Sequence, residues 1–293
     1  MSFRPRRSVL YMPGSNARAI EKARTLAADA VILDLEDSVA PDAKVAARRQ
    51  VMQAVTTGGF GAREVVVRVN ALDTEWHFDD MMAAANAAPD AILVPKISTA
   101  EQIEQIGQRL LDMRADHRTR LWAMIETPVA LFNILSLAAE AHDSETRLSA
   151  FVMGTNDIAK ETRARIVPGR APMLAWLMNC IAAAHIHGVD ILDGVYNDLA
   201  DADGFAAECA QARDMGFDGK TLIHPNQIPS CNDAFSPSAD EVEQARMIIA
   251  VFDHPQNKDK GVVQIDGRMV ERLHAEMARR TVAIADAIEA RSG

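Results

Sequence analysis

The sequence has little of several features that mark particular classes of protein. Only three of its 293 residues are cysteines, and their wide spacing forms neither a metal-ligand motif nor a disulfide framework; they are Cys180, Cys209 and Cys231. No apolar run approaches the roughly 20 residues of a membrane-spanning helix. The N-terminal segment MSFRPRRSVLYMPG lacks the hydrophobic region of a signal peptide. We therefore expect a protein of the reducing cytoplasm with three buried, unpaired thiols.

Positive charge is also scarce. The chain has 31 lysine and arginine residues against 41 aspartate and glutamate residues, which gives a formal net charge of −10. A nucleic-acid-binding protein needs a basic face for phosphates, and polybasic attachment to a membrane needs a cluster of lysine and arginine. We expect neither partner. The hydrophobic share of 48% is typical of a soluble globular protein with a full core.

Short apolar segments recur along the chain and alternate with alanine-rich segments of helical periodicity. The candidate strands are SVLYMP (8–13), AVILDLE (30–36), EVVVRVN (64–70), AILVPK (91–96), LWAMIE (121–126), AFVMG (150–154), VDILDGV (189–195) and GKTLI (219–223). Apolar strands that alternate with helices indicate a parallel sheet covered by helices. Eight such units predict a TIM (β/α)8 barrel, whose usual size is about 250 residues. A doubly wound open sheet is the alternative, but its GxGxxG signature is missing.

The pattern changes after Ile223. The segment HPNQIPSCNDAFSPSADE contains three prolines, and two helical stretches follow at about 238–254 and 267–291. We predict a catalytic barrel of residues 1–228 and a C-terminal helical arm of residues 229–293. The arm is too short and too helical to hold a core of its own.

Polar residues collect where the predicted strands end. In chain order they are Glu36, Asp37, Arg68, Asn70, Lys96, Glu126, Asn156, Asp157, Tyr196, Asn197 and Asp198. An acid at such a place can simply cap the next helix, and a base can pair with a nearby acid. In a barrel, however, these strand ends converge on the active site. Charges that converge in a partly dry cavity need a metal ion or an anionic ligand to balance them.

Glu126 and Asp157 are the strongest candidates for metal ligands. They follow adjacent strands, and no histidine or cysteine cluster stands beside them. Hard oxygen ligands of this kind favour Mg²⁺. Glu36 and Asp37 would then orient metal-bound waters. Arg68 would hold a substrate carboxylate or a developing oxyanion.

Taken together, the motifs resemble those of the citrate lyase β-subunit-like branch of the HpcH/HpaI aldolase superfamily. The resemblance covers nearly the whole chain and rests on RSVLYMPGSN, DAVILDLEDSVAPDAK, VVVRVN, AILVPK, IETP, GTNDIAKE, PGR, DGVYND, GFDGKTLIHPNQI and GRMVE. It implies a trimer of TIM barrels, or a dimer of trimers, that binds Mg²⁺, a CoA thioester and a 2-keto acid. The arm would pack on a neighbouring subunit.

Carried over by position, the resemblance makes Glu126 and Asp157 the metal ligands and Glu36 and Asp37 the acidic pair behind the metal. Arg68 would hold the keto-acid or thioester oxygens. Substrate-binding residues would then be Arg68, Glu126, Gly154, Thr155 and Asn156. The segments RSVLYMPG, DGVYND and GKTLIHP lie where the family places coenzyme A, and His224 in the last of them either faces the ligand or is structural. Two expectations are open for Arg163, Arg165 and Arg170, namely contacts to CoA phosphates and salt bridges between subunits.

One position departs from the family. Family lyases usually carry MVD in the arm, and that aspartate acts as the acid/base in a neighbouring subunit's site. Here Glu271 stands at this position, in GRMVERL. The extra methylene can displace the carboxylate by about 1 Å, and such a displacement can cost around 100-fold in rate. We expect an altered or slower step, or hydrolysis in its place; the structural alternative is an exposed surface residue.

The resemblance implies a Mg²⁺-dependent carbon–carbon lyase. It would cleave or form a 3-hydroxyacyl-CoA such as citramalyl-CoA or malyl-CoA, with pyruvate or glyoxylate and acetyl-CoA as products. Its catalytic residues would be Arg68, Glu271, Glu36 and Asp37. Two alternatives are a malyl-CoA-type thioesterase and a citrate lyase β subunit that acts on an acyl-carrier-protein thioester.

Overall fold

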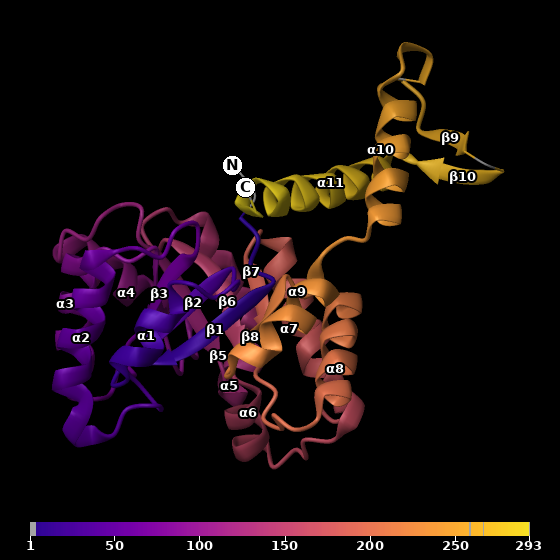
Figure 1. The fold of residues 1–293 in the computed structure, drawn as a ribbon. Coiled ribbons are helices and arrows are strands. Elements are labelled where there is room, and N and C mark those ends of the chain that lie inside the picture. The colour runs from indigo at the N-terminus through magenta and orange to yellow at the C-terminus, as the bar shows by residue number, and fades with distance from the viewer. Residues whose placement is uncertain (1–3, 258, 266, 293) are drawn as a thin grey trace. The chain divides into compact units, whose positions relative to one another are not determined.

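The computed structural model describes residues 4–257, 259–265 and 267–292 (Figure 1). The chain forms two compact units. One is Arg6–Ala234, and the other comprises the described residues of 1–5 and 235–293. No helix in these ranges combines the length and the apolar character that a membrane crossing requires.

The first unit is a closed barrel of parallel strands, as the sequence predicts. The strands are β1 (Ser8–Pro13), β2 (Ala30–Asp34), β3 (Glu64–Arg68), β4 (Ala91–Val94), β5 (Arg120–Ile125), β6 (Leu148–Met153), β7 (Asp190–Asp193) and β8 (Gly219–Leu222). Each strand pairs with its sequence neighbours, and β8 closes on β1 with Ser8 opposite Lys220. The alternative of an open doubly wound sheet is therefore wrong.

Helices surround this barrel (Figure 1). They are α1 (Ala17–Ala23), α2 (Lys44–Thr57), α3 (His77–Ala87), α4 (Ala100–Asp112), α5 (Pro128–Ala139), α6 (Thr155–Thr162), α7 (Leu174–Ile186), α8 (Ala202–Met215) and α9 (Ile228–Phe235). Several begin with a side-chain cap. The Thr127 hydroxyl accepts a hydrogen bond from Ala130 N, and Pro128 occupies the first helical position, where a missing N–H costs nothing. The one-turn helices η3 (Pro168–Arg170) and η4 (Pro225–Gln227) lie in loops.

Inward-facing residues of strands β1 to β7 fill the barrel. The buried cluster consists of Val9, Ala30, Ile32, Val66, Ala91, Leu93, Trp122, Met124, Ala150, Val152 and Leu192. A filled interior of this kind is a packed core and leaves the chemistry to the ends of the strands. Cys180, Cys209 and Cys231 are all buried and free, as predicted.

The second unit contains α10 (Ala239–Asp253), the antiparallel strands β9 (Val262–Ile265) and β10 (Arg268–Glu271), and α11 (Arg272–Ser292). A helix was predicted from about residue 267, and this is wrong for 268–271, which pair with β9. The unit also buries a small apolar cluster of Phe252, Val263 and Ala275, which the sequence analysis did not expect. That the arm packs on a neighbouring subunit stays a prediction.

Candidate active site

A pocket of about 320 Å³ opens at the carboxyl ends of the barrel strands. Its lining residues are Tyr11, Asp34, Asp37, Ser38, Arg68, Met124, Met153, Gly154, Thr155, Asn156, Asp157, Val195, Asn197, Thr221 and Ile223. The structure thus brings together most of the residues that the sequence assigned to the site. Glu36 and Glu126 are buried and do not line the pocket. Their carboxylates act on the lining residues through charge, as described below.

Arg68 ends β3 and is held by Asp34, which ends β2 directly beside it. The Nε and Nη2 atoms of Arg68 donate to the two Asp34 oxygens at 2.6 and 2.8 Å. The guanidinium also lies over the Tyr11 ring, 4.8 Å from its centre. Burial alone would lower the pKa of Arg68, but the Asp34 carboxylate raises it well above its ordinary value. Arg68 is therefore a fixed cation whose fork is already paired with Asp34.

Glu36 lies behind the pocket with incomplete pairing. Its Oε2 is 2.9 Å from Nη1 of Arg68, but this ion pair is not aligned as a hydrogen bond, and the oxygen is buried. Its Oε1 lies 3.7 Å from the Lys96 ammonium, which is half exposed. Burial raises the pKa of Glu36, and the lowering effect of Arg68 does not offset it. A further cation would therefore stabilise this carboxylate.

Glu126, after β5, is 1% exposed and positioned from two sides. Its Oε1 accepts a hydrogen bond of 2.8 Å from the backbone N of Lys96, a residue held at φ 57°. Gly154 packs against it so closely that a Cβ atom there would lie 2.6 Å from Oε2. Burial raises the pKa of Glu126 to about 8, and the charges of Glu36 and Asp157 add to the effect.

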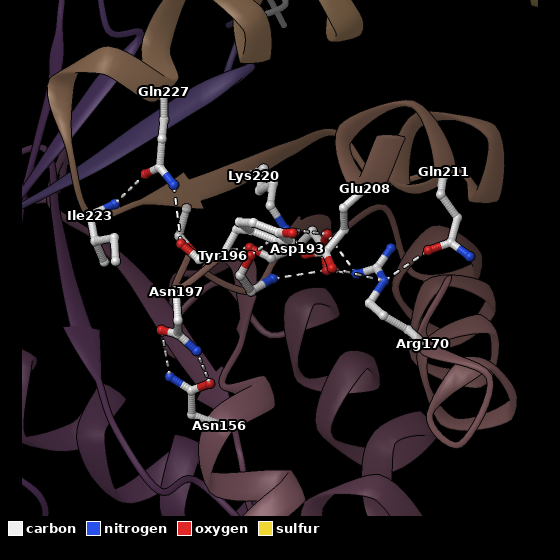
Figure 2. A network of polar contacts seen from close by, with 12 residues as sticks. Asn156, Arg170, Asp193, Tyr196, Asn197, Glu208, Gln211, Lys220, Ile223 and Gln227 are labelled. Carbon is white, nitrogen blue, oxygen red and sulfur yellow. Dashed lines mark hydrogen bonds and ion pairs between the residues drawn. The ribbon is translucent and has the colours of Figure 1, made fainter. Parts of the chain in front are cut away.

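Asp157 lies in the first turn of α6 and lines the pocket. The neighbouring Asn156 pairs with Asn197, which follows β7, through reciprocal amide hydrogen bonds of 3.3 and 2.8 Å (Figure 2). These bonds connect the wall after β6 to the wall after β7. Asp157 therefore lies in the first turn of α6, and the loop after β7 supports this turn through hydrogen bonds.

The charges around the pocket do not balance. Five carboxylates line the pocket or lie behind it, and two cations accompany them. The carboxylates are those of Asp34, Glu36, Asp37, Glu126 and Asp157, and the cations are Arg68 and Lys96. Within the described ranges, no three histidine, cysteine, aspartate or glutamate side chains are arranged to hold a metal ion. Mg²⁺ needs only one or two carboxylates, because waters and substrate oxygens complete its shell. The carboxylates of Glu126 and Asp157 are oxygen donors of the kind that Mg²⁺ prefers, and their assignment as its ligands stays a prediction.

Other predicted residues have different surroundings. Glu271 is exposed at the end of β10 in the second unit, where its backbone N donates to Nδ1 of His274 at 2.9 Å. Its acid/base role stays a prediction. His224 caps η4, accepting from Asn226 N at 3.2 Å. Arg170 is 5% exposed and bonded to Asp193, which contradicts both expectations for that arginine.

Some site features were missed by sequence reasoning. Asp34 was not recognised as the partner of Arg68, although both end neighbouring parallel strands. The Lys96 backbone contact to Glu126 depends on a left-handed backbone conformation that has no sequence signal at a lysine. Tyr11 supplies a buried hydroxyl without a hydrogen-bond partner among the described residues.

Comparisons with known proteins identify the family. Residues 7–225 match the HpcH/HpaI aldolase/citrate lyase family. A (3S)-malyl-CoA thioesterase of Cereibacter sphaeroides is 49% identical over 286 residues, which cover 98% of this chain and 96% of that protein. The citrate lyase subunit beta of Escherichia coli is 34% identical over 288 residues, 97% of this chain and 94% of the other.

A solved structure shows the same likeness. It is the protein CitE of Mycobacterium tuberculosis in complex with magnesium, acetoacetate and coenzyme A, which is 27% identical. It superposes with a TM-score of 0.76 over 96% of this chain and 98% of that one. The family match, the relatives and the barrel therefore agree, and the chain belongs to the HpcH/HpaI aldolase/citrate lyase family.

Proposed function

We propose that the protein hydrolyses a CoA thioester of the malyl-CoA type to the free hydroxy acid and coenzyme A. The observation that carries this proposal is the 49% identity to a (3S)-malyl-CoA thioesterase over 98% of this chain, which includes most of the arm. The sequence analysis ranked carbon–carbon cleavage first and hydrolysis second. The likeness to the thioesterase reverses that order.

The pocket suits a small acyl group, with Arg68 and a bound Mg²⁺ to receive its negative charge. Its volume of about 320 Å³ lies in the range of small-molecule sites. Arg68, immobilised by Asp34, would bind a carboxylate or a developing oxyanion through Nη1, which without ligand lies 3.8 Å from Met124 Sδ and 2.9 Å from Glu36 Oε2. Glu126 and Asp157 would hold Mg²⁺, which when bound would polarise the carbonyl oxygen that it contacts.

Hydrolysis requires a water molecule and a proton acceptor. The water oxygen forms a bond to the thioester carbon, the carbon–sulfur bond breaks, and the thiolate takes up a proton. We assign the proton transfers to Glu271, supplied by the arm of a neighbouring copy in a trimer. The support is its position in GRMVE, where the family's lyases carry an aspartate. Glu36 would orient the water from behind the pocket and Asp37 from its exposed margin.

Carbon–carbon cleavage is the second candidate. The solved CitE structure with magnesium, acetoacetate and coenzyme A favours it, as does the 34% identity to a citrate lyase subunit beta. In that reaction the bond between the hydroxyl-bearing carbon and the thioester's α-carbon breaks. The hydroxyl oxygen gives up its proton and becomes the carbonyl of the keto acid, and the α-carbon of acetyl-CoA takes up a proton; we assign both transfers to Glu271.

One assay separates these reactions. Purified protein is incubated with (3S)-malyl-CoA or citramalyl-CoA and Mg²⁺, and free thiol and keto acid are measured in parallel. We expect free thiol without keto acid. Keto acid without free thiol would assign the lyase reaction instead. Inactivity with both esters, together with turnover of an acyl-carrier-protein thioester, would assign the protein to a citrate-lyase-like complex.

The metal assignment has its own test within this assay. Glu126→Gln and Asp157→Asn should each abolish the Mg²⁺ dependence along with the activity. Gln108→Ala, an exposed position on α4, is the control and should behave like the wild type. Full Mg²⁺-dependent activity in both carboxylate variants would show that the metal lies elsewhere.

A further inference from the structure

A second charged cluster lies between β7, β8, α8 and η3, outside the catalytic groups named above (Figure 2). It consists of Arg170, Asp193, Glu208 and Lys220. Lys220 and Asp193 are 0% exposed. Nη1 of Arg170 donates to both Asp193 oxygens at 2.7 Å. Its two cations and two carboxylates balance, so this cluster calls for neither a metal nor an anionic ligand.

Lys220 is the centre of the cluster. Its ammonium donates to Asp193 Oδ2 at 2.8 Å, to Glu208 Oε1 at 2.7 Å and to the backbone carbonyl of Gly194 at 2.6 Å. These bonds match the three donors of an ammonium group. Burial alone would lower the pKa of Lys220, but Asp193 and Glu208 raise it, so the side chain stays a cation. The third bond reaches out of the cluster to the chain that forms the pocket wall.

Gln227, on η4, holds the same stretch of chain at a second point. Its Nε2 donates to the carbonyl of Tyr196 at 3.1 Å, and its Oε1 accepts from Ile223 N at 3.0 Å (Figure 2). The carbonyls of Gly194 and Tyr196 are therefore both fixed. Between them lies Val195, a lining residue of the pocket. Side chains from β8 and its following turn thus anchor the loop after β7.

The anchored loop in turn supports the start of α6. Gly194 packs so closely on Thr155 that a Cβ atom at 194 would lie 2.4 Å from its hydroxyl oxygen. Asn197 completes the support through its two hydrogen bonds to Asn156. Asp157 is the next residue of the same helical turn. The loop position therefore determines where a large part of the pocket wall stands.

We propose that Lys220 and Gln227 are positioning residues that hold the Gly194 and Tyr196 carbonyls and so fix the pocket wall of Val195, Asn197 and the first turn of α6. Neither side chain lines the pocket. Both act on the bound ligand through the 194–197 backbone. If the pocket wall is mobile before the ligand binds, binding must also order it. The conformational entropy lost in that ordering weakens the affinity for the ligand. The kinetic part of the test rests on the proposed function.

The test uses two independent variants, each of which removes one of the two side-chain anchors of the 194–197 backbone. Lys220→Met/Glu208→Gln removes one charge of each sign and leaves the Arg170–Asp193 pair intact, while Gln227→Met changes no charge. Arg6→Met/Glu64→Gln is the matched control, since it removes a buried ion pair at the other end of the barrel. KM and kcat for (3S)-malyl-CoA are measured well below each melting temperature. Hydrogen exchange of the peptide covering 194–200 is measured without ligand.

We expect KM to rise about tenfold in both loop variants, with a smaller change in kcat, and exchange of 194–200 to become faster. The control should lose melting temperature but keep the wild-type KM and exchange. Unchanged KM and exchange in both loop variants would overturn the proposal, and so would an equal rise of KM in the control. If the wild type turns over no ester, the proposed function fails, and hydrogen exchange alone decides whether the two side chains anchor the loop.

Discussion

Both ends of the barrel bury charged side chains, but they pair these charges differently. At the amino end, Arg6 donates to both oxygens of Glu64 at 2.7 and 2.8 Å and also bonds Asp190. Its guanidinium lies over the ring of Trp122, a residue of the buried core cluster. Each of these bonds joins opposite charges within the chain. Each charge of this cluster has a partner of opposite sign, and removal of one partner would leave a buried charge uncompensated.

The pocket at the carboxyl end is different because, among the described residues, neither Glu36 nor Glu126 has a hydrogen-bonded cation. The Asp34 carboxylate pairs with the guanidinium of Arg68. Glu36 and Glu126 are buried without such a partner, and their pKa values are raised. A carboxylate kept in that state destabilises the fold unless a cation joins it. Perturbed groups of this kind mark functional sites more often than structural ones. We interpret the charged cluster at the amino end as structural and the pocket at the carboxyl end as a binding site.

The largest effect that separates the two ends should come from an added methyl group. In Gly154→Ala, the new Cβ would lie 2.4 Å from the Cβ of Glu126, so the carboxylate must move. We expect activity to fall by about 100-fold or more, since displacements near 1 Å have that cost. In Gly107→Ala, on α4, the new Cβ would lie 2.8 Å from the Glu145 carbonyl oxygen near the amino end. This control should lose stability and keep the activity of its folded fraction; equal activity losses in the two variants would remove the distinction.

A smaller effect, on stability alone, is expected at the amino end. Glu64→Gln leaves the buried Arg6 guanidinium without its main carboxylate. Breaking a buried pair costs about 3–5 kcal/mol, and we expect a loss of roughly 3 kcal/mol in urea unfolding. KM and kcat per folded molecule should stay at wild-type values. A variant with normal stability and altered KM would assign a functional role to the amino end.

The smallest effect is expected at the exposed margin of the pocket. The Asp37 side chain is 67% exposed, and its carboxylate lies 3.7 Å from Nη1 of Arg68. Asp37→Asn should change the free energy of unfolding by no more than about 0.5 kcal/mol. We expect a few-fold change in KM that shrinks as ionic strength rises, because salt screens an exposed charge. A salt-independent change would show that Asp37 contacts the ligand directly.

Much of this arrangement could be predicted from the sequence, because strand order and strand ends carry the signal. The predicted strand 8–13 coincides with β1, and the parallel barrel follows from the alternation of apolar strands and helices. Once the barrel is known, residues after the strands converge. Glu126 and Asp157 could therefore be selected from type and position alone.

The rest depends on contacts that a linear pattern does not encode. Lys220 occurs in GKTLI as a polar residue of a short strand, and its partners Asp193 and Glu208 come from β7 and α8. The β9–β10 pair did carry a signal that was missed, since an Asp-Gly dipeptide separates two apolar runs in VVQIDGRMVE. The expected roles of Arg170 were wrong because an arginine in a loop gives no sign of its burial.

The central claim is that Glu126 is held ionised only at a cost that a cation relieves. A carboxyl whose folded pKa is raised to about 8 favours folding at low pH, and that contribution is lost as pH rises through 8. The pKa rises from 4.5 to about 8, and each unit is worth about 1.4 kcal/mol, so the loss is on the order of 4 kcal/mol at pH 8. Glu126→Gln has no such loss and can still accept the Lys96 N–H.

The decisive measurement is therefore urea unfolding of wild type and Glu126→Gln in EDTA at pH 8 and pH 5, repeated with Mg²⁺. We predict that the variant is the more stable protein at pH 8, that the difference nearly vanishes at pH 5, and that Mg²⁺ stabilises only the wild type. A variant that is less stable than the wild type at pH 8 in EDTA, as Glu64→Gln should be, would contradict the account.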